Sequence, residues 1–128
     1  MAITTPEQLA LAKRVRTQLI EHPGQHDQAT FYGENLCGTT ACTAGWTAVL
    51  NGASPVIRGH PSAGLWATYV ITPSGGRKRI WTYAQDALGL TDEEAADLFD
   101  ADTSESTVVD HLGQLIGDAE ASLSAATR

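Results

Sequence analysis

The run Cys37-Gly38-Thr39-Thr40-Ala41-Cys42-Thr43-Ala44-Gly45-Trp46 opens an apolar stretch that ends at Gly52. It carries both cysteines of the chain and the first of its three tryptophans. The pattern predicts a helix that starts at Thr39 or Thr40, where a threonine hydroxyl caps the first turn, and ends at Asn51. Apolar and small residues lie on more than one side of this helix, which is typical of a helix buried at the centre of a domain.

Helix signals also occur on both sides of this central stretch. Thr5-Pro6-Glu7-Gln8 is a capping box that predicts a first helix, and His22-Pro23 predicts its end. After a short helix closed by Gly89, a second capping box, Thr91-Asp92-Glu93-Glu94, starts another. A last helix is expected to begin at Ser104 or Ser106. Residues 23–36 read as an irregular connection.

The segment between the central helix and the later helices has β character. Residues 65–72 are rich in aromatic and β-branched side chains, and Pro73-Ser74-Gly75-Gly76 can turn the chain back. We therefore predict one hairpin over residues 65–81, with Trp66 and Trp81 facing each other. An exposed tryptophan there would instead indicate a binding surface. The Arg77-Lys78-Arg79 run either contacts phosphate or an acidic partner, or protects a strand edge.

Together these signals predict a mainly α (α+β) fold. We expect residues 1–128 to form a single compact domain of about five helices with one small β-hairpin, and residues 82–126 to form an acidic helical half. Hydrophobic residues make up 42% of the chain and charged residues 18%, which is typical of a globular protein. No apolar run is long enough for a membrane span or a secretory signal, so we expect a cytoplasmic protein with reduced thiols.

Charge is distributed unevenly along the chain. The net charge of -7 makes direct nucleic-acid binding unfavourable. Residues 1–80 hold seven basic and four acidic residues, whereas residues 81–128 hold eleven acidic residues and Arg128. This asymmetry predicts a surface for a partner, although acidic helices also keep a small protein soluble. The predicted binding residues are Asp92, Glu93, Asp97, Asp100, Asp102 and Glu105.

Three stretches together resemble a group of small proteins of actinobacteria and their bacteriophages. They are the run from His22 to Gln28, the cysteine run, and the run from Ala87 to Phe99. The pattern C-G-T-x-x-C-x-A-G-W is the specific part of the resemblance. The resemblance implies an intracellular protein, encoded by a phage and acting on a host factor, and it supplies no mechanism.

Two chemical alternatives involve the cysteines. His22 and His26, followed by Cys37 and Cys42, supply paired ligands of the kind that tetrahedral zinc prefers. Cys42 also lies on the predicted core stripe, where a free cysteine acts as a small hydrophobe. A second hypothesis makes Cys37 or Cys42 a nucleophile at a helix N-terminus. Its partner would be His26, His60 or His111, and the sequence does not fix which; Cys37 and His60 are the candidate catalytic residues.

No complete catalytic set and no phosphate-binding loop appear in the sequence. We therefore expect a non-enzymatic intracellular interaction protein without a cofactor, which binds a host protein through its acidic helical face. A variant of this hypothesis has the acidic face mimic nucleic acid. The alternative is a small Cys/His hydrolase or a zinc-binding protein that uses Cys37 and Cys42. The oligomeric state stays open.

Overall fold

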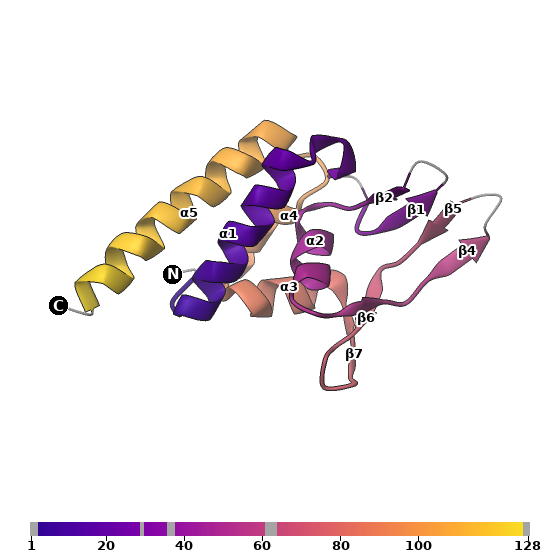
Figure 1. The fold of residues 1–128 in the computed structure, drawn as a ribbon, viewed down its shortest axis with the longest axis horizontal. Helices are drawn as coiled ribbons and strands as arrows, with labels where there is room; N and C mark the ends of the chain where they lie inside the picture. The colour runs from indigo at the N-terminus through magenta and orange to yellow at the C-terminus, as the bar shows by residue number, and fades with distance from the viewer. Residues whose placement is uncertain (1–2, 29, 36–37, 61–63, 127–128) are drawn as a thin grey trace.

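A computed structural model describes residues 3–28, 30–35, 38–60 and 64–126 of the chain. Within these ranges five α-helices and seven short strands are present, together with one 3-10 turn, η1 (Pro23–Gln25). Helices lie on one side of the molecule and strands on the other (Figure 1). The prediction of a mainly α fold with about five helices is confirmed. The helices are α1 (Pro6–Glu21), α2 (Thr43–Leu50), α3 (Ile80–Leu88), α4 (Asp92–Phe99) and α5 (Glu105–Ala126).

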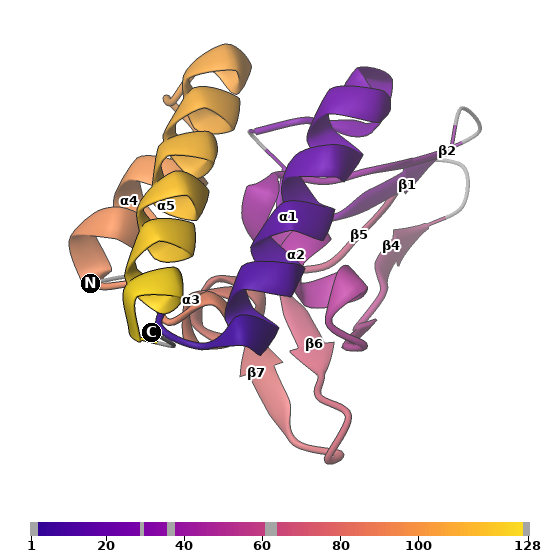
Figure 2. The same cartoon turned by 60° about the vertical axis from the view of Figure 1, so that its left-hand side comes forward.

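The β structure is larger than the one hairpin that we predicted. A four-stranded antiparallel sheet has the order β2-β1-β5-β4, and a three-stranded antiparallel sheet has the order β3-β6-β7. The four-stranded sheet stands away from the helices as an arm (Figures 1 and 2). The strands are β1 (Gly33–Asn35), β2 (Gly38–Thr40), β3 (Ser54–Pro55), β4 (Arg58–His60), β5 (Gly64–Trp66), β6 (Tyr69–Ile71) and β7 (Arg77–Arg79).

The hairpin predicted over residues 65–81 is present, with its turn at residues 72–76, but its strands are shorter than predicted and the pairing of Trp66 with Trp81 is wrong. The observed hairpin joins β6 to β7, and Tyr69 lies opposite Arg79. Trp66 belongs to β5, where it lies opposite Gly33 of β1 and Arg58 of β4. Trp81 lies in α3, which begins at Ile80. The Ile80 amide donates to the Thr68 carbonyl, and strand pairing ends there. The two tryptophans therefore do not form a cross-strand pair.

The central position predicted for the cysteine-run helix is confirmed. Every residue from Thr43 to Ala48 of α2 is buried, and α2 packs against α1, α3 and α4. Gly45 permits this packing, because a Cβ at this position would overlap the carbonyl oxygen of Phe31. Backbone from the 25–31 loop thus lies directly against α2, and only glycine fits there.

The predicted start of this helix is wrong. Thr39 and Thr40 belong to β2, and α2 begins only at Thr43 with Cys42 at the N-cap position. The shift occurs because the backbone of Ala41 is already bonded to the preceding loop. Its amide donates to the Gln25 carbonyl and its carbonyl accepts from the Asp27 amide, each at 3.0 Å. Threonine also favours extended structure, since its branched side chain suits a pleated strand.

The capping signals of the other helices are confirmed, but α3 begins at Ile80, inside the segment 65–81 that we predicted as a hairpin. Both capping boxes are formed, between Thr5 and Gln8 and between Thr91 and Glu94. Gly89 ends α3 in the left-handed conformation, with a φ of 67°. The Ser104 hydroxyl accepts a hydrogen bond from the Thr107 amide at the start of α5. Within the described ranges, no helix is both long and apolar enough to cross a membrane.

Candidate functional site

The cysteine run holds the loop that precedes it. Besides the two Ala41 backbone bonds, the Trp46 indole nitrogen donates to the Gln25 carbonyl at 2.9 Å, and the Cys42 amide donates to the Thr30 carbonyl at 2.7 Å. The described part of the motif therefore holds the loop through contacts to Gln25, Asp27 and Thr30. Its alanine, glycine and tryptophan are explained by packing and hydrogen bonding alone.

A buried polar network extends these contacts to α4. The Gln28 amide nitrogen donates to the carbonyls of Leu98 and Asp100, at 2.7 and 3.0 Å. The Gln28 side-chain oxygen accepts from the Thr43 hydroxyl at 3.2 Å and lies 2.9 Å from His26 Nε2. Because an amide oxygen can only accept, His26 Nε2 carries the proton. That nitrogen therefore has no lone pair to offer a metal ion.

Cys42 is the one candidate nucleophile whose side chain is described. It is 1% exposed, and its burial raises the pKa of the thiol to about 11, although backbone amides at the start of α2 act in the opposite direction. A thiol of this kind stays protonated at neutral pH and is a poor nucleophile. Cys37 lies outside the described residues, and His60 is described only through its backbone in β4. The Cys37–His60 pair therefore stays a prediction.

The three candidate zinc ligands that are described, His22, His26 and Cys42, do not form a metal site. His22 is exposed at the end of α1, whereas His26 and Cys42 are buried. Within the described ranges, no group of three or more His, Cys, Asp or Glu side chains is arranged to hold a metal ion. Since Cys37 lies outside those ranges, the zinc hypothesis stays a prediction.

The six predicted acidic binding residues all lie at the surface, on α4, on the turn after it and at the start of α5. Asp97 lies 3.9 Å from His111 Nε2, and Asp92 accepts a hydrogen bond from Gln85 at 2.8 Å. Among the described residues, none of the six forms an ion pair with lysine or arginine. The structure thus gathers these carboxylates on the helical side, as expected from their positions in the sequence.

A second set of side chains, on one strand pair from each sheet, combines arginines with apolar groups. The registers place Arg58 opposite Trp66, Arg77 opposite Ile71, and Arg79 opposite Tyr69. Trp66 is 47% exposed and Ile71 is 39% exposed. The guanidinium of Arg77 lies 4.5 Å from the centre of the Tyr69 ring. We call these six residues the basic strand surface: Arg58, Trp66, Tyr69, Ile71, Arg77 and Arg79.

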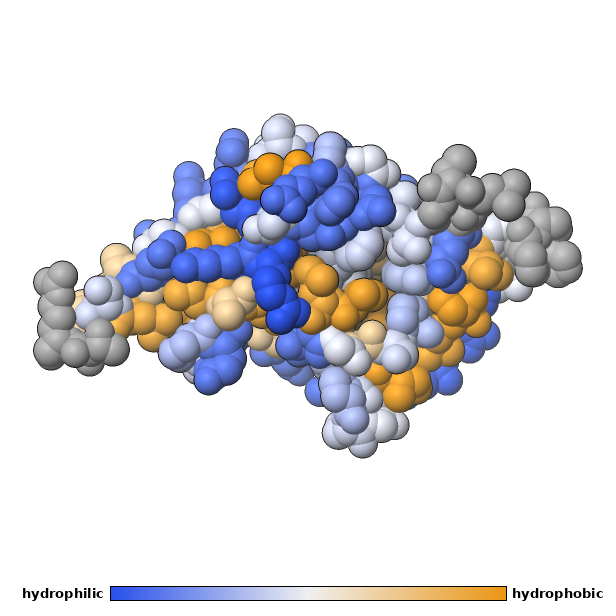
Figure 3. Space-filling view, in the orientation of Figure 1, coloured by the Kyte–Doolittle hydropathy of each residue, from blue (hydrophilic) through white to orange (hydrophobic). Residues whose placement is uncertain are grey.

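Apolar residues are unusually exposed around these strands. Of the four large hydrophobic side chains that are exposed in the described ranges, Trp66, Ile71 and Ile57 lie on or beside the strands. Figure 3 shows apolar residues gathered along this edge of the molecule, with polar residues beside them. In the sequence the arginine run and Trp66 are separate features, and the predicted pairing of Trp66 with Trp81 differs from the registers that place arginines opposite apolar residues.

Two hollows with aromatic walls lie next to the basic strand surface. The larger has a volume of about 530 Å³ and is lined by Phe31, Thr68, Tyr69, Arg79, Trp81 and Thr82. The smaller, of about 260 Å³, shares Phe31 and Trp81 with the first and adds Phe99 and Asp100 to its lining.

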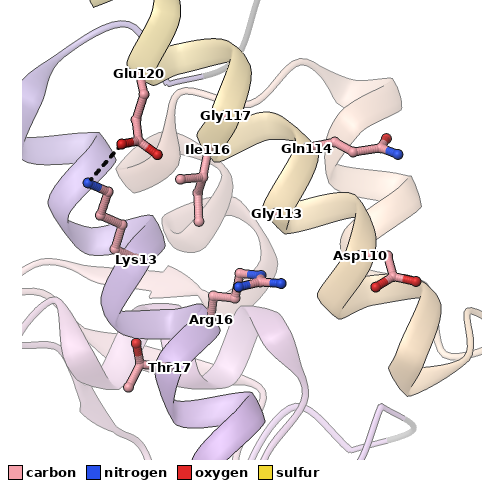
Figure 4. A pocket seen from close by; sticks show the side chains of 9 residues that line it. All are labelled: Lys13, Arg16, Thr17, Asp110, Gly113, Gln114, Ile116, Gly117 and Glu120. Atoms are coloured by element: carbon pink, nitrogen blue, oxygen red, sulfur yellow. Dashed lines mark hydrogen bonds and ion pairs between the residues drawn. The ribbon is translucent and has the colours of Figure 1, made fainter.

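A third hollow, of about 740 Å³, lies between α1 and α5 and has a different character. Lys13 and Arg16 project from α1, while Asp110 and Glu120 project from α5 (Figure 4). Lys13 is 3.4 Å from Glu120, and Arg16 donates to the Val109 carbonyl at 3.1 Å. These contacts join the two helices, so the polar groups around this hollow are largely used within the fold.

A comparison of the chain with protein-family models, with curated protein sequences and with solved structures found no match. Function is therefore inferred from the surfaces themselves.

Proposed function

We propose that this chain is a non-enzymatic interaction protein that binds another protein through the basic strand surface. The observation that carries the proposal is the pairing of each of three arginines, across the strands, with an exposed or half-buried apolar side chain. Tryptophan, tyrosine and arginine are the residues that most often dominate binding energy at protein interfaces. Large hydrophobic side chains left together in solvent also mark such interfaces.

The chemistry of the cysteine motif supports a non-enzymatic role. The pKa of the Cys42 thiol is raised and not lowered, and the Nε2 proton of His26 is committed to Gln28. Ala41, Cys42, Gly45 and Trp46 each have a backbone, indole or packing contact to the preceding loop that accounts for them. Catalysis by Cys37 is the alternative, and labelling with iodoacetamide near neutral pH tests it directly.

The acidic helical face is the second candidate surface. Its six carboxylates are exposed and have no lysine or arginine ion-pair partner among the described residues. We rank it below the basic strand surface, because exposed carboxylates alone also serve solubility, whereas exposed tryptophan and isoleucine do not.

A protein of a bacterial host is the first partner to test. The resemblance to actinobacterial and phage proteins supports a phage-encoded protein that acts in the host cytoplasm. The net charge of -7 weighs against a nucleic acid as the direct partner, since binding to phosphates depends on many basic contacts.

The test compares affinity capture by two variants of equal net charge. Arg58→Ala with Arg77→Ala removes two positive charges from the basic strand surface. Gln114→Glu with Ser122→Glu adds two negative charges to exposed positions of α5. We expect the arginine variant to lose a saturable partner from an actinobacterial lysate by about tenfold or more, and the α5 variant to retain it. Equal capture of the partner by both variants contradicts the proposal. If capture is lost only when Asp97 and Asp100 are neutralised, the binding site lies on the acidic face.

A further inference from the structure

We propose that the two aromatic hollows form one groove for an extended peptide segment of the partner, in which a large apolar side chain stands next to a carboxylate. This inference rests on the proposed function, because it assigns the chemistry of the partner that the basic strand surface meets. The groove consists of the 530 Å³ hollow, the 260 Å³ hollow and the Phe31–Trp81 pair between them.

The larger hollow is suited to an apolar anchor. Phe31, Tyr69 and Trp81 supply three aromatic side chains, all half-buried, while Thr68 and Thr82 supply hydroxyl groups. Its volume of about 530 Å³ lies in the range of pockets that enclose small ligands, and it accommodates a large side chain with part of its backbone. Aromatic walls with a few polar groups favour an apolar side chain held in one orientation.

The smaller hollow continues the groove past the Phe31–Trp81 pair. These two rings meet edge to face, with their centres 6.5 Å apart, and Trp81 meets Phe99 in the same way at 5.5 Å. Trp81 is thus held from both sides, so the wall shared by the hollows is rigid. A rigid, preformed wall lowers the entropic cost of binding a flexible segment.

The two ends of the groove differ in charge. Arg79 lines the larger hollow, where no acidic side chain is present, and it has no ion-pair partner among the described residues. Asp100 lines the smaller hollow and is exposed. A carboxylate of the bound segment is therefore favoured at the Arg79 end, and an amide or basic group at the Asp100 end. This difference fixes the direction in which the segment lies.

The same contacts favour a peptide over a nucleotide. The guanidinium groups of Arg77 and Arg79 lie 4.5 and 5.9 Å from the centre of the Tyr69 ring, so this ring already has cationic partners and is less available to stack on a base. Asp100 at the far end would repel a phosphate. Lys78, the remaining base of β7, lies 3.5 Å from Asp86 of α3 and is not directed to the groove.

The experiment is selection of a displayed random peptide library on the full chain. We expect the enriched peptides to share a large apolar residue beside an acidic one. A synthetic peptide of the enriched sequence should bind Arg79→Glu about tenfold or more weakly than it binds the unchanged protein. Lys78→Glu is the matched control, because it makes the same charge change on the same strand. We expect it to alter the affinity by less than about twofold.

Circular dichroism and the unfolding midpoint establish that both variants fold. As a second readout, the indole N–H signal of Trp81 should shift on peptide binding in the unchanged protein. Enrichment of no common sequence, equal weakening by both variants, or binding of nucleoside monophosphates in place of peptides would overturn the inference. Any of these three outcomes rejects the groove. The proposed function still holds if capture of the partner depends on Arg58 and Arg77.

Discussion

At the residue scale, Gly45 and Cys42 show how the cysteine motif serves the core. Gly45 lies where the backbone of the 25–31 loop meets α2, so that any side chain would collide with a carbonyl oxygen. Cys42 lies at the N-cap position of α2, where it is buried with a raised thiol pKa. Both residues therefore have a structural reason to be present, and each leads to a measurement.

Gly45→Ala should destabilise the fold strongly. The new methyl group would overlap the Phe31 carbonyl and would lie within 2.8 Å of the Ala41 Cβ, so the loop must move away. We expect a loss of about 3 kcal/mol in the free energy of unfolding, measured by urea denaturation. Gly117→Ala is the control, because nothing lies within 4 Å of its added Cβ in α5. It should be neutral or stabilise by up to about 1 kcal/mol. Equal stability of the two variants would refute the close approach.

The Cys42 thiol should make stability depend on pH in the alkaline range. Folding raises its pKa from 9.0 to about 11, so the unfolded chain releases this proton first as the pH rises. The contribution of Cys42 is therefore fully present below pH 9 and is lost between pH 9 and 11, at up to roughly 1.4 kcal/mol per pH unit. The check compares unfolding free energies of the Cys37→Ser protein and the same protein with Cys42→Ala, across this range. A pH-independent difference between them would contradict the burial of the thiol.

At the element scale, Gln28 connects the loop, α2 and the end of α4. Its side chain accepts from the Thr43 hydroxyl and donates to the carbonyls of Leu98 and Asp100. Carbonyl groups at the end of a helix have no partner within that helix, so this amide satisfies part of the C-terminus of α4.

Gln28→Ala should loosen the end of α4 while the rest of the fold persists. It leaves two carbonyls and the Thr43 hydroxyl without their partner, for which we expect a loss of about 1–3 kcal/mol. In the variant, hydrogen exchange at the last amides of α4 should speed up relative to the unchanged protein, and by more than exchange in α2. Gln25→Ala is the control, since the Gln25 side chain bonds only to exposed Gln18 among the contacts in the described ranges. Unchanged exchange in α4 would show that the network does not hold this helix.

The sequence predicted helices far better than strands, for physical reasons that can be seen at individual residues. Thr5, Thr91 and Gly89 act within a few residues of themselves, so their effects on helix ends are local. The strands are two or three residues long, too short to show a clear alternation, and some of their pairings join segments that are distant in sequence, as for Gly33 with Trp66. The acidic face was predictable because its members follow one another along the chain. The basic strand surface was not, because it depends on the registers of two strand pairs, β4 with β5 and β6 with β7.

At the scale of the whole molecule, the six predicted carboxylates and the basic strand surface belong to different parts of the fold. In Figure 2, α4 and α5 lie on one side and the four-stranded sheet on the other. The six predicted carboxylates belong to the helical side, whereas Arg58, Arg77 and Arg79 belong to the strands. The protein has a net charge of -7, yet it presents basic and apolar side chains at its strands. These side chains suit an acidic segment of a protein partner, whereas the net charge disfavours a nucleic acid.

The most direct test of the central claim is nuclear magnetic resonance of the isotope-labelled protein during titration with the captured partner. We predict that the Trp66 indole signal and the backbone signals of Tyr69, Ile71 and Arg77 shift or broaden first. Signals of α4 should stay in place until much higher partner concentrations. Changes confined to Asp92, Asp97 and the turn after α4, with the strand signals unaffected, would contradict the account.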